Sequence, residues 1–191
     1  SDYHHELDLT TAVNTVTYKV GDTEYTRQCI ASNPDDVIAM HIKASRPESI
    51  TVELELQLLR NAEVVASGNQ LIYTGNAEFE KHGRGGVLFE GRIAAEIKGG
   101  TIKADGKKLL IDKATEVLLL SDVRTNYKNT TFAGYDYQQK CKETIEAASK
   151  KSFKTLRNTH VEDYTPLFSR VALSFGDNGK FSHLPNDQRW A

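Results

Sequence analysis

The alternation of apolar and polar residues predicts that most of this chain forms β-strands. From Ile50 to Leu59 nearly every second residue is apolar, and the residues between them are mostly polar. This period of two is typical of a strand with one buried and one solvated face, as in antiparallel sheets. Comparable patterns predict further strands at residues 4–10, 13–20, 23–32, 37–44, 70–74, 87–98, 101–104, 108–112 and 115–123.

The turns and the most apolar run indicate how these strands associate. Gly21-Asp22 separates two strand patterns by two residues, which predicts a tight hairpin. The run Val117–Leu120 is apolar on both faces and predicts a central strand covered on both sides. Polar residues of the strand at 87–98, such as Glu90 and Arg92, are expected on a solvated face. Short strands joined by glycine turns predict a mainly β, antiparallel sandwich over residues 4–127.

The periodicity changes after residue 134. Tyr137, Cys141, Ile145 and Ala148 share one stripe of a predicted helix over residues 135–151. A second helix is expected from Ser152, a plausible N-cap, to about Val171, with a kink or break at Pro166. The chain therefore predicts a sandwich followed by a two-helix segment at 135–175.

Composition and charge narrow the classes of function. The 191 residues carry 24 basic and 26 acidic side chains, for a net charge of -2. Long-range attraction to a polyanion is weak at this balance, so a nucleic-acid partner is not expected. No run reaches the roughly 18 apolar residues that a membrane span needs. Cys29 and Cys141 fit two semi-buried thiols, although pairing between them stays open.

The sequence contains no complete catalytic signature. His4 and Glu6 can share a strand face, but they are too few for a convincing metal site. Glu53 and Glu55 lie roughly 6.5 to 7 Å apart by strand rise, near the separation of glycosidase carboxylates, yet a solvated face explains them better. We assign no catalytic residue, no metal ligand and no cofactor.

Two polar groups remain as weaker candidates. Arg124, Thr125, Asn126 and Tyr127 follow the most buried strand pattern, and such strand ends often carry ligand contacts. An ordinary loop or a domain contact is the alternative. In the second helix, His160 and Tyr164 share a face, with Asp163 nearby, and we expect both to pack on the sheet with one hydrogen bond each.

Several stretches together resemble the N-terminal region of glycoside hydrolase family 95, the α-L-fucosidases. They occur in the order of that family, and the resemblance extends over nearly the whole chain. The stretches are Tyr3–Val13, Tyr25–Arg27, Ala31–Ile38, Val87–Glu90, Ala104–Gly106, His160–Tyr164, Leu167–Val171 and Leu184–Arg189. The sequence departs from the family at Gln28–Ile30, where an acidic and an aromatic residue are usual, and at Trp190.

The resemblance implies a super-sandwich fold and a place in a larger enzyme. Residues 4–127 would form the N-terminal sandwich, whose first strands can precede Ser1. Residues 135–175 would form a helical linker packed on it, and 176–191 the start of the link to an (α/α)₆ catalytic barrel. That barrel would carry the catalytic acid and base, so no catalytic residue is transferred to this chain.

The implied partners are the barrel of the same polypeptide and a fucosylated (or α-L-galactosyl) glycan, outside the cytoplasm. The segment Arg124–Tyr127 would border the barrel or its cleft. The alternative is an independent carbohydrate-binding or adhesive sandwich module. Such a module would need exposed aromatic residues on its strands, and the strand patterns offer few of them.

Overall fold

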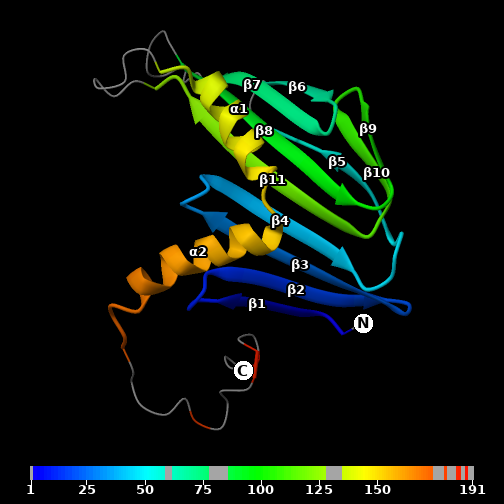
Figure 1. The fold of residues 1–191 in the computed structure, drawn as a ribbon, viewed down its shortest axis with the longest axis vertical. Helices are drawn as coiled ribbons and strands as arrows, with labels where there is room; N and C mark the ends of the chain where they lie inside the picture. Colours follow the sequence, from blue (N-terminus) through cyan, green and yellow to red (C-terminus); the bar gives the residue numbers. More distant parts are fainter. Residues whose placement is uncertain are drawn as a thin grey trace.

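The computed structural model describes residues 2–58, 62–77, 86–127 and 135–173, together with residues 179, 184, 185 and 188. It confirms a mainly β fold with two helices near the end of the chain (Figure 1). The described strands are β1 (His4–Asp8), β2 (Val13–Val20), β3 (Thr23–Ser32), β4 (Val37–Ala44), β5 (Ile50–Glu55), β6 (Ala62–Ser67), β7 (Gln70–Ala77), β8 (Val87–Lys98), β9 (Thr101–Asp105), β10 (Lys108–Ala114) and β11 (Glu116–Thr125).

The strands form two sheets of unequal size. The larger sheet has eight described strands in the order β1-β2-β3-β4-β11-β8-β7-β6, and the smaller has the order β5-β10-β9. Every pairing is antiparallel. β11 lies between β4 and β8, as its two apolar faces predict: Val117 is 1% exposed on one face and Leu118 8% on the other.

Each face of the large sheet is covered by a different layer. One face, which we call the helix face, packs against α1 (Tyr137–Ala148) and α2 (Phe153–Phe168), with Leu120, Ile145 and Leu156 in its core. The opposite face, which we call the sandwich face, packs against the small sheet, with Val117, Leu109 and Ile111 in its core. Figure 1 shows both helices in front of the large sheet and the small sheet behind it.

Both helices begin at side chains that cap their free amide groups. Asp136 accepts hydrogen bonds from the backbone N–H groups of Gln138 and Gln139, at 3.1 and 3.0 Å. Ser152 accepts one from Thr155 N–H at 3.1 Å and starts α2, as predicted. We predicted a kink or a break at Pro166, and the break is wrong, because α2 continues through this residue to Phe168. Pro166 lies in the last turn and removes one backbone hydrogen bond, that of its own missing N–H to the carbonyl of Glu162.

Most predicted strands are present, but some boundaries differ. The hairpin at Gly21 is confirmed, and its φ of +58° is the left-handed conformation that glycine permits. The strand predicted from Ile50 to Leu59 ends at Glu55, and Leu58 is 38% exposed. β6 was not predicted. The segment 176–191 lies outside the described residues except for Gly179, Leu184, Pro185 and Gln188.

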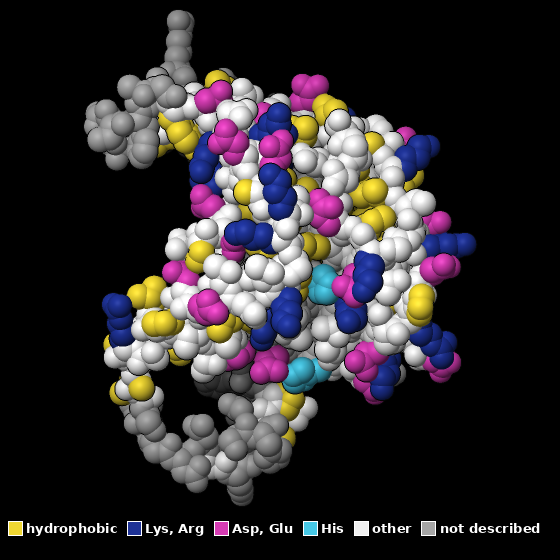
Figure 2. Space-filling view, viewed as in Figure 1, with side chains coloured by type: hydrophobic (Ala, Val, Ile, Leu, Met, Phe, Trp, Pro, Cys, Tyr) yellow, Lys and Arg dark blue, Asp and Glu magenta, His cyan; other side chains and the backbone are white. Residues whose placement is uncertain are grey.

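Acidic and basic side chains are interspersed over the face seen in Figure 2, without a large area of one sign. Among the described residues, no helix is long and apolar enough to cross a membrane.

Candidate functional site

Arg124, the first residue of the predicted ligand segment, is held by carboxylates of the chain itself. Its Nε lies 2.8 Å from Oδ2 of Asp122, and its Nη2 lies 2.7 Å from Oδ2 of Asp36. Burial alone would lower the pKa of Arg124, but the hydrogen bonds to Asp122 and Asp36 outweigh it and raise the pKa further. The Arg124 side chain is 19% exposed. Through its two ion pairs it connects β11 to the turn between β3 and β4.

The other three residues of the segment have different environments. Asn126 holds the start of β8, because its backbone N–H donates to Leu88 O at 3.0 Å and its Oδ1 accepts from Leu88 N–H at 2.9 Å. Thr125 Oγ1 accepts a weak hydrogen bond from Tyr127 N–H at 3.4 Å. The Tyr127 side chain is 73% exposed and is the residue of the segment most available to a partner.

The structure gathers part of this segment around a shallow cavity of about 460 Å³. Arg124, Thr125 and Tyr127 line it, and Asn126 does not. Val123 of β11 also lines it, and Tyr135, just before α1, and Lys140, in the first turn of α1, complete the lining. Sequence reasoning did not single out these two residues, because no local pattern indicates that the helix start returns to the end of β11.

A layer of paired charges lies beneath α1. Glu90 is 4% exposed and Asp122 is 9% exposed. Across the strands, Glu90 is opposite Arg124, and Asp122 is opposite Arg92. Glu90 Oε1 lies 2.7 Å from Arg92 Nη2, while its Oε2 accepts a hydrogen bond from Gln138 Nε2 at 3.0 Å. The prediction that Glu90 and Arg92 face solvent is wrong, because α1 covers this part of the helix face.

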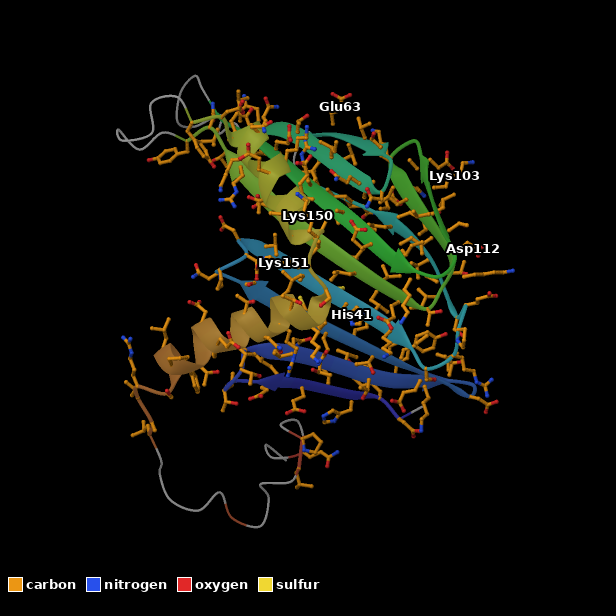
Figure 3. The ribbon with its side chains drawn as sticks, viewed as in Figure 1. His41, Glu63, Lys103, Asp112, Lys150 and Lys151 are labelled. Atoms are coloured by element: carbon orange, nitrogen blue, oxygen red, sulfur yellow. The ribbon has the colours of Figure 1, made fainter. Side chains whose placement is uncertain are left out.

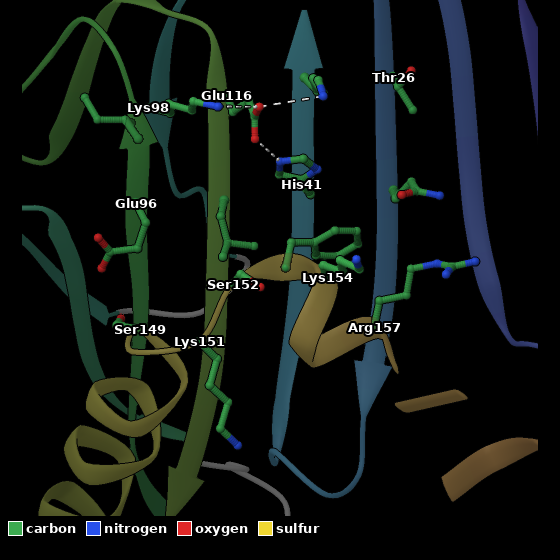
Figure 4. A pocket seen from close by; sticks show the side chains of 15 residues that line it. Thr26, His41, Glu96, Lys98, Glu116, Ser149, Lys151, Ser152, Lys154 and Arg157 are labelled. Atoms are coloured by element: carbon green, nitrogen blue, oxygen red, sulfur yellow. Dashed lines mark hydrogen bonds and ion pairs between the residues drawn. The ribbon is translucent and has the colours of Figure 1, made fainter. Parts of the chain in front are cut away.

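A polar cavity lies where α2 begins. We call it the polar basin; its volume is about 620 Å³, and Figure 4 shows its lining. Its floor is the polar half of the helix face, with His41 and Glu116 at the centre, and its wall is the first turn of α2. Its lining includes the polar side chains of Gln28, His41, Glu96, Glu116, Lys154 and Arg157.

His41 is fixed by a ring on one side and a carboxylate on the other. Its ring stacks on Phe153 with centroids 4.8 Å apart, and its Nε2 lies 3.3 Å from Glu116 Oε2. Burial lowers the pKa of His41 against the opposing effect of Glu116, so the imidazole is neutral at neutral pH. Burial alone would raise the pKa of Glu116, but His41, Lys98 and Lys43 outweigh it and leave that pKa below its ordinary value.

This arrangement favours hydrogen bonding to a polar partner. Glu116 is ionised and neutralised within the chain, since Lys98 Nζ lies 3.4 Å and Lys43 Nζ 3.8 Å from its Oε1. Lys154 and Arg157 add cations from α2. Sequence reasoning missed His41, because its alternation in β4 marked a face but not the helix that begins beside it (Figure 3).

The His160 group performs the packing role that was predicted for it. His160 Nε2 hydrogen-bonds Thr11 O at 3.0 Å, and Tyr164 OH donates to Leu9 O at 3.0 Å. Thr165 Oγ1 donates to Thr10 O at 3.2 Å. Three consecutive carbonyl groups of the β1–β2 turn therefore bind one face of α2, and this fixes the helix on the sheet.

The remaining candidate side chains from the sequence have ordinary environments. His4 and Glu6 are both exposed, 3.4 Å apart, and no group of three or more metal-ligating side chains occurs in the described part of the chain. Lys108 bridges Glu53 and Glu55. Cys29 and Cys141 are free thiols on opposite faces of the sheet; Cys141 is fully buried on the helix face, and burial, ahead of Asp122 and Glu90, raises its pKa to about 12.

A large antiparallel sheet, a smaller sheet on one face and two capped helices on the other define a β-sandwich domain with a helical extension. Residues 1–130 match the family described as glycosyl hydrolase family 65, N-terminal domain. The chain belongs to this family.

Two relatives are similar to this chain in sequence, and one solved structure is similar in fold. The chain is 30% identical to alpha-L-fucosidase 2 of Arabidopsis thaliana, over 91% of its own length and 23% of the relative's. It is 28% identical to a probable alpha-fucosidase A of Aspergillus niger, over 97% of its own length and 25% of the relative's. A putative kojibiose phosphorylase from the human microbiome has the same fold, with a TM-score of 0.59, 13% identity, and coverage of 86% of this chain and 24% of that one. The chain thus spans about a quarter of these proteins.

Proposed function

We propose that the chain is a non-catalytic N-terminal domain of a family 95-like glycoside hydrolase that acts on α-L-fucosyl, or related α-L-galactosyl, glycans. One observation carries the proposal: nearly the whole chain aligns with alpha-fucosidases, yet it covers only 23% to 26% of their lengths. The rest of such a protein would supply the catalytic (α/α)₆ barrel. Because glycan substrates lie outside the cytoplasm, we propose an extracytoplasmic location.

In this proposal residues 4–127 form the sandwich, 135–175 the linker helices and 176–191 the start of the barrel connection. The contacts of α2 support a bracing role. Its polar face is bound to the β1–β2 turn through His160 and Tyr164, and Lys151 Nζ lies 2.6 Å from the nearly buried Asp35 Oδ1 just before it. A helix fixed at both ends would hold the following polypeptide in one direction. The Arg124–Tyr127 segment would border the barrel through Tyr127.

The carboxylates support the non-catalytic part of the proposal. An inverting glycosidase needs two carboxyl groups about 6.5 to 9.5 Å apart across a water and a sugar. Glu90 and Asp122 are buried against arginines, and Glu116 is bound to His41 and lysines. Each would have to break its own ion pair before it could transfer a proton to a sugar.

The test compares the 191-residue chain with the longer polypeptide on a nitrophenyl α-L-fucoside. We expect hydrolysis by the long protein and none by the chain. Turnover by the chain itself, abolished by changing one of its own carboxylates, would overturn the proposal. A glycan titration of the chain tests the alternative binding module, and a dissociation constant in the millimolar range or tighter would favour it.

A further inference from the structure

The sandwich face of the large sheet is only partly covered. Within the described ranges, eight strands form the large sheet and three form the small sheet. The small sheet covers the part of this face that contains Leu71, Ala95 and Val117, all at most 1% exposed. Of β3 only Tyr25 packs against this core cluster, and β2 and the first half of β4 contribute no residue to it, so the two layers do not match in extent.

The uncovered part of this face carries apolar side chains, which are unusual for a sheet face in contact with solvent. In β4, Val37 and Ala39 point to the helix face and are 4% and 0% exposed. The alternate residues Ile38 and Met40 point to the sandwich face and are 54% and 37% exposed. A strand that is apolar on both faces is typical of one covered on both sides. The sequence of β4 therefore indicates that a further layer covers its sandwich face, and the described residues do not supply this layer.

A groove marks where this cover would lie. β5 is the edge of the small sheet and, among the described strands, pairs only with β10. Beside it lies a cavity of about 360 Å³ whose lining includes Tyr18, Arg27 and Ile42 of the large sheet and Val52 of β5. Val52 is 41% exposed, although its neighbours Ile50 and Leu54 belong to the core or pack against it. An added strand would lie about 4.8 Å from β5, directly over this groove.

We infer that the small sheet continues past β5 with at least one more strand, supplied by the same polypeptide outside these 191 residues. This strand would pair with the free edge of β5 and bury Met40 and Ile38 against the sandwich face. The inference rests on the proposed place of the chain in a longer glycosidase. It is supported by the continuity of the groove with the existing sheet-to-sheet core and by the length of the relatives, about four times that of this chain.

A second copy of the chain is a poorer occupant of the edge. Two-fold pairing of β5 with β5 of another copy would place both Glu53–Glu55 pairs close together on one outward face. Like charges at neighbouring cross-strand positions destabilise a sheet. A strand from elsewhere in the polypeptide carries no such constraint.

Cys29 provides a reporter on this surface. It is opposite Met40 in the β3–β4 pairing and therefore lies on the sandwich face, partly exposed. The experiment uses the long polypeptide at a concentration where it is monomeric, with maleimide labelling followed by peptide mass spectrometry. We expect Cys29 to remain unlabelled in the native protein and to label after denaturation. The matched control is Thr101→Cys on the exposed edge strand β9, which should label in the native protein.

Native labelling of Cys29 as fast as the Thr101→Cys control would overturn the inference. Protection that disappears on dilution would assign the surface to a second copy and also overturn it. Hydrogen exchange of the peptide over residues 50–55 tests the strand itself: all its amides should be protected, and fast exchange of every second amide would contradict pairing at the free edge. Fucosidase activity is measured separately, so failure of the proposed function stays distinguishable from failure of this inference.

Discussion

Arg124 separates a structural role from a ligand-binding role, and its replacement tests the distinction. The Arg124→Met change removes the guanidinium but keeps much of the side-chain volume. Asp122, whose side chain is 7% exposed, then loses the partner at 2.8 Å from its Oδ2. Asp36, whose side chain is 56% exposed, can be solvated instead. The cost therefore comes mainly from Asp122.

The magnitude follows from the cost of an uncompensated buried charge. Removing one partner of a buried pair costs about 3 to 5 kcal/mol, and the lower value applies here because Arg124 is 19% exposed. A domain is stable by roughly 5 to 15 kcal/mol, so a loss of this size should markedly lower the urea midpoint of the chain. Circular dichroism would monitor the unfolding. Combining it with Asp122→Leu should recover much of the loss, because the charged pair is then replaced by apolar groups.

Tyr127→Ala is the matched control in the same segment. Tyr127 is 73% exposed, so its loss should change stability by no more than about 0.5 kcal/mol. The reasoning fails if Arg124→Met leaves the urea midpoint unchanged while raising the KM of the long enzyme for its glycan. That result would make Arg124 a ligand contact, and the pairing with Asp122 energetically unimportant.

Two further predictions concern local features of the fold. Hydrogen bonds from Thr10 and Thr11 lower the pKa of Asp8 from 3.8 to about 2. A lowered folded-state pKa contributes stability that is fully present above pH 3.8 and is lost as the pH falls towards 2, so Asp8→Asn should make the thermal midpoint depend less on pH in this range. An unchanged dependence of the midpoint on pH would contradict the prediction. At Gly91 an added Cβ would lie 2.0 Å from Cζ of Tyr73, so Gly91→Ala should cost about 1 to 3 kcal/mol by overpacking. In urea unfolding, the same change made in a Tyr73→Ala background should cost much less, and equal costs in the two backgrounds would exclude the clash.

Local periodicity was sufficient for much of the fold. The strand predicted over 87–98 has the bounds of β8, and the buried residues of α1 include Cys141, Ile145 and Ala148 of the predicted stripe. Both features repeat with a regular period over eight or more residues. β6 was missed because Ala62–Ser67 is short and has only Val64 fully buried. The early end of β5 could not be predicted, because Leu56 and Leu58 continue the apolar alternation beyond the paired residues.

The candidate site was harder to predict because alternation assigns a residue to a face but does not say what covers that face. For this one reason, the expectation from alternation fails in opposite directions at Glu90 and Met40. Glu90 follows the pattern of a solvated face, yet α1 lies over it, from a segment 48 residues later in the case of Gln138. Met40 follows the pattern of a buried face, yet among the described residues it is 37% exposed. Cover is a non-local property, so a polar residue found buried indicates a layer that the sequence did not reveal. An apolar residue found exposed on a central strand indicates, by the same argument, a layer still to be added.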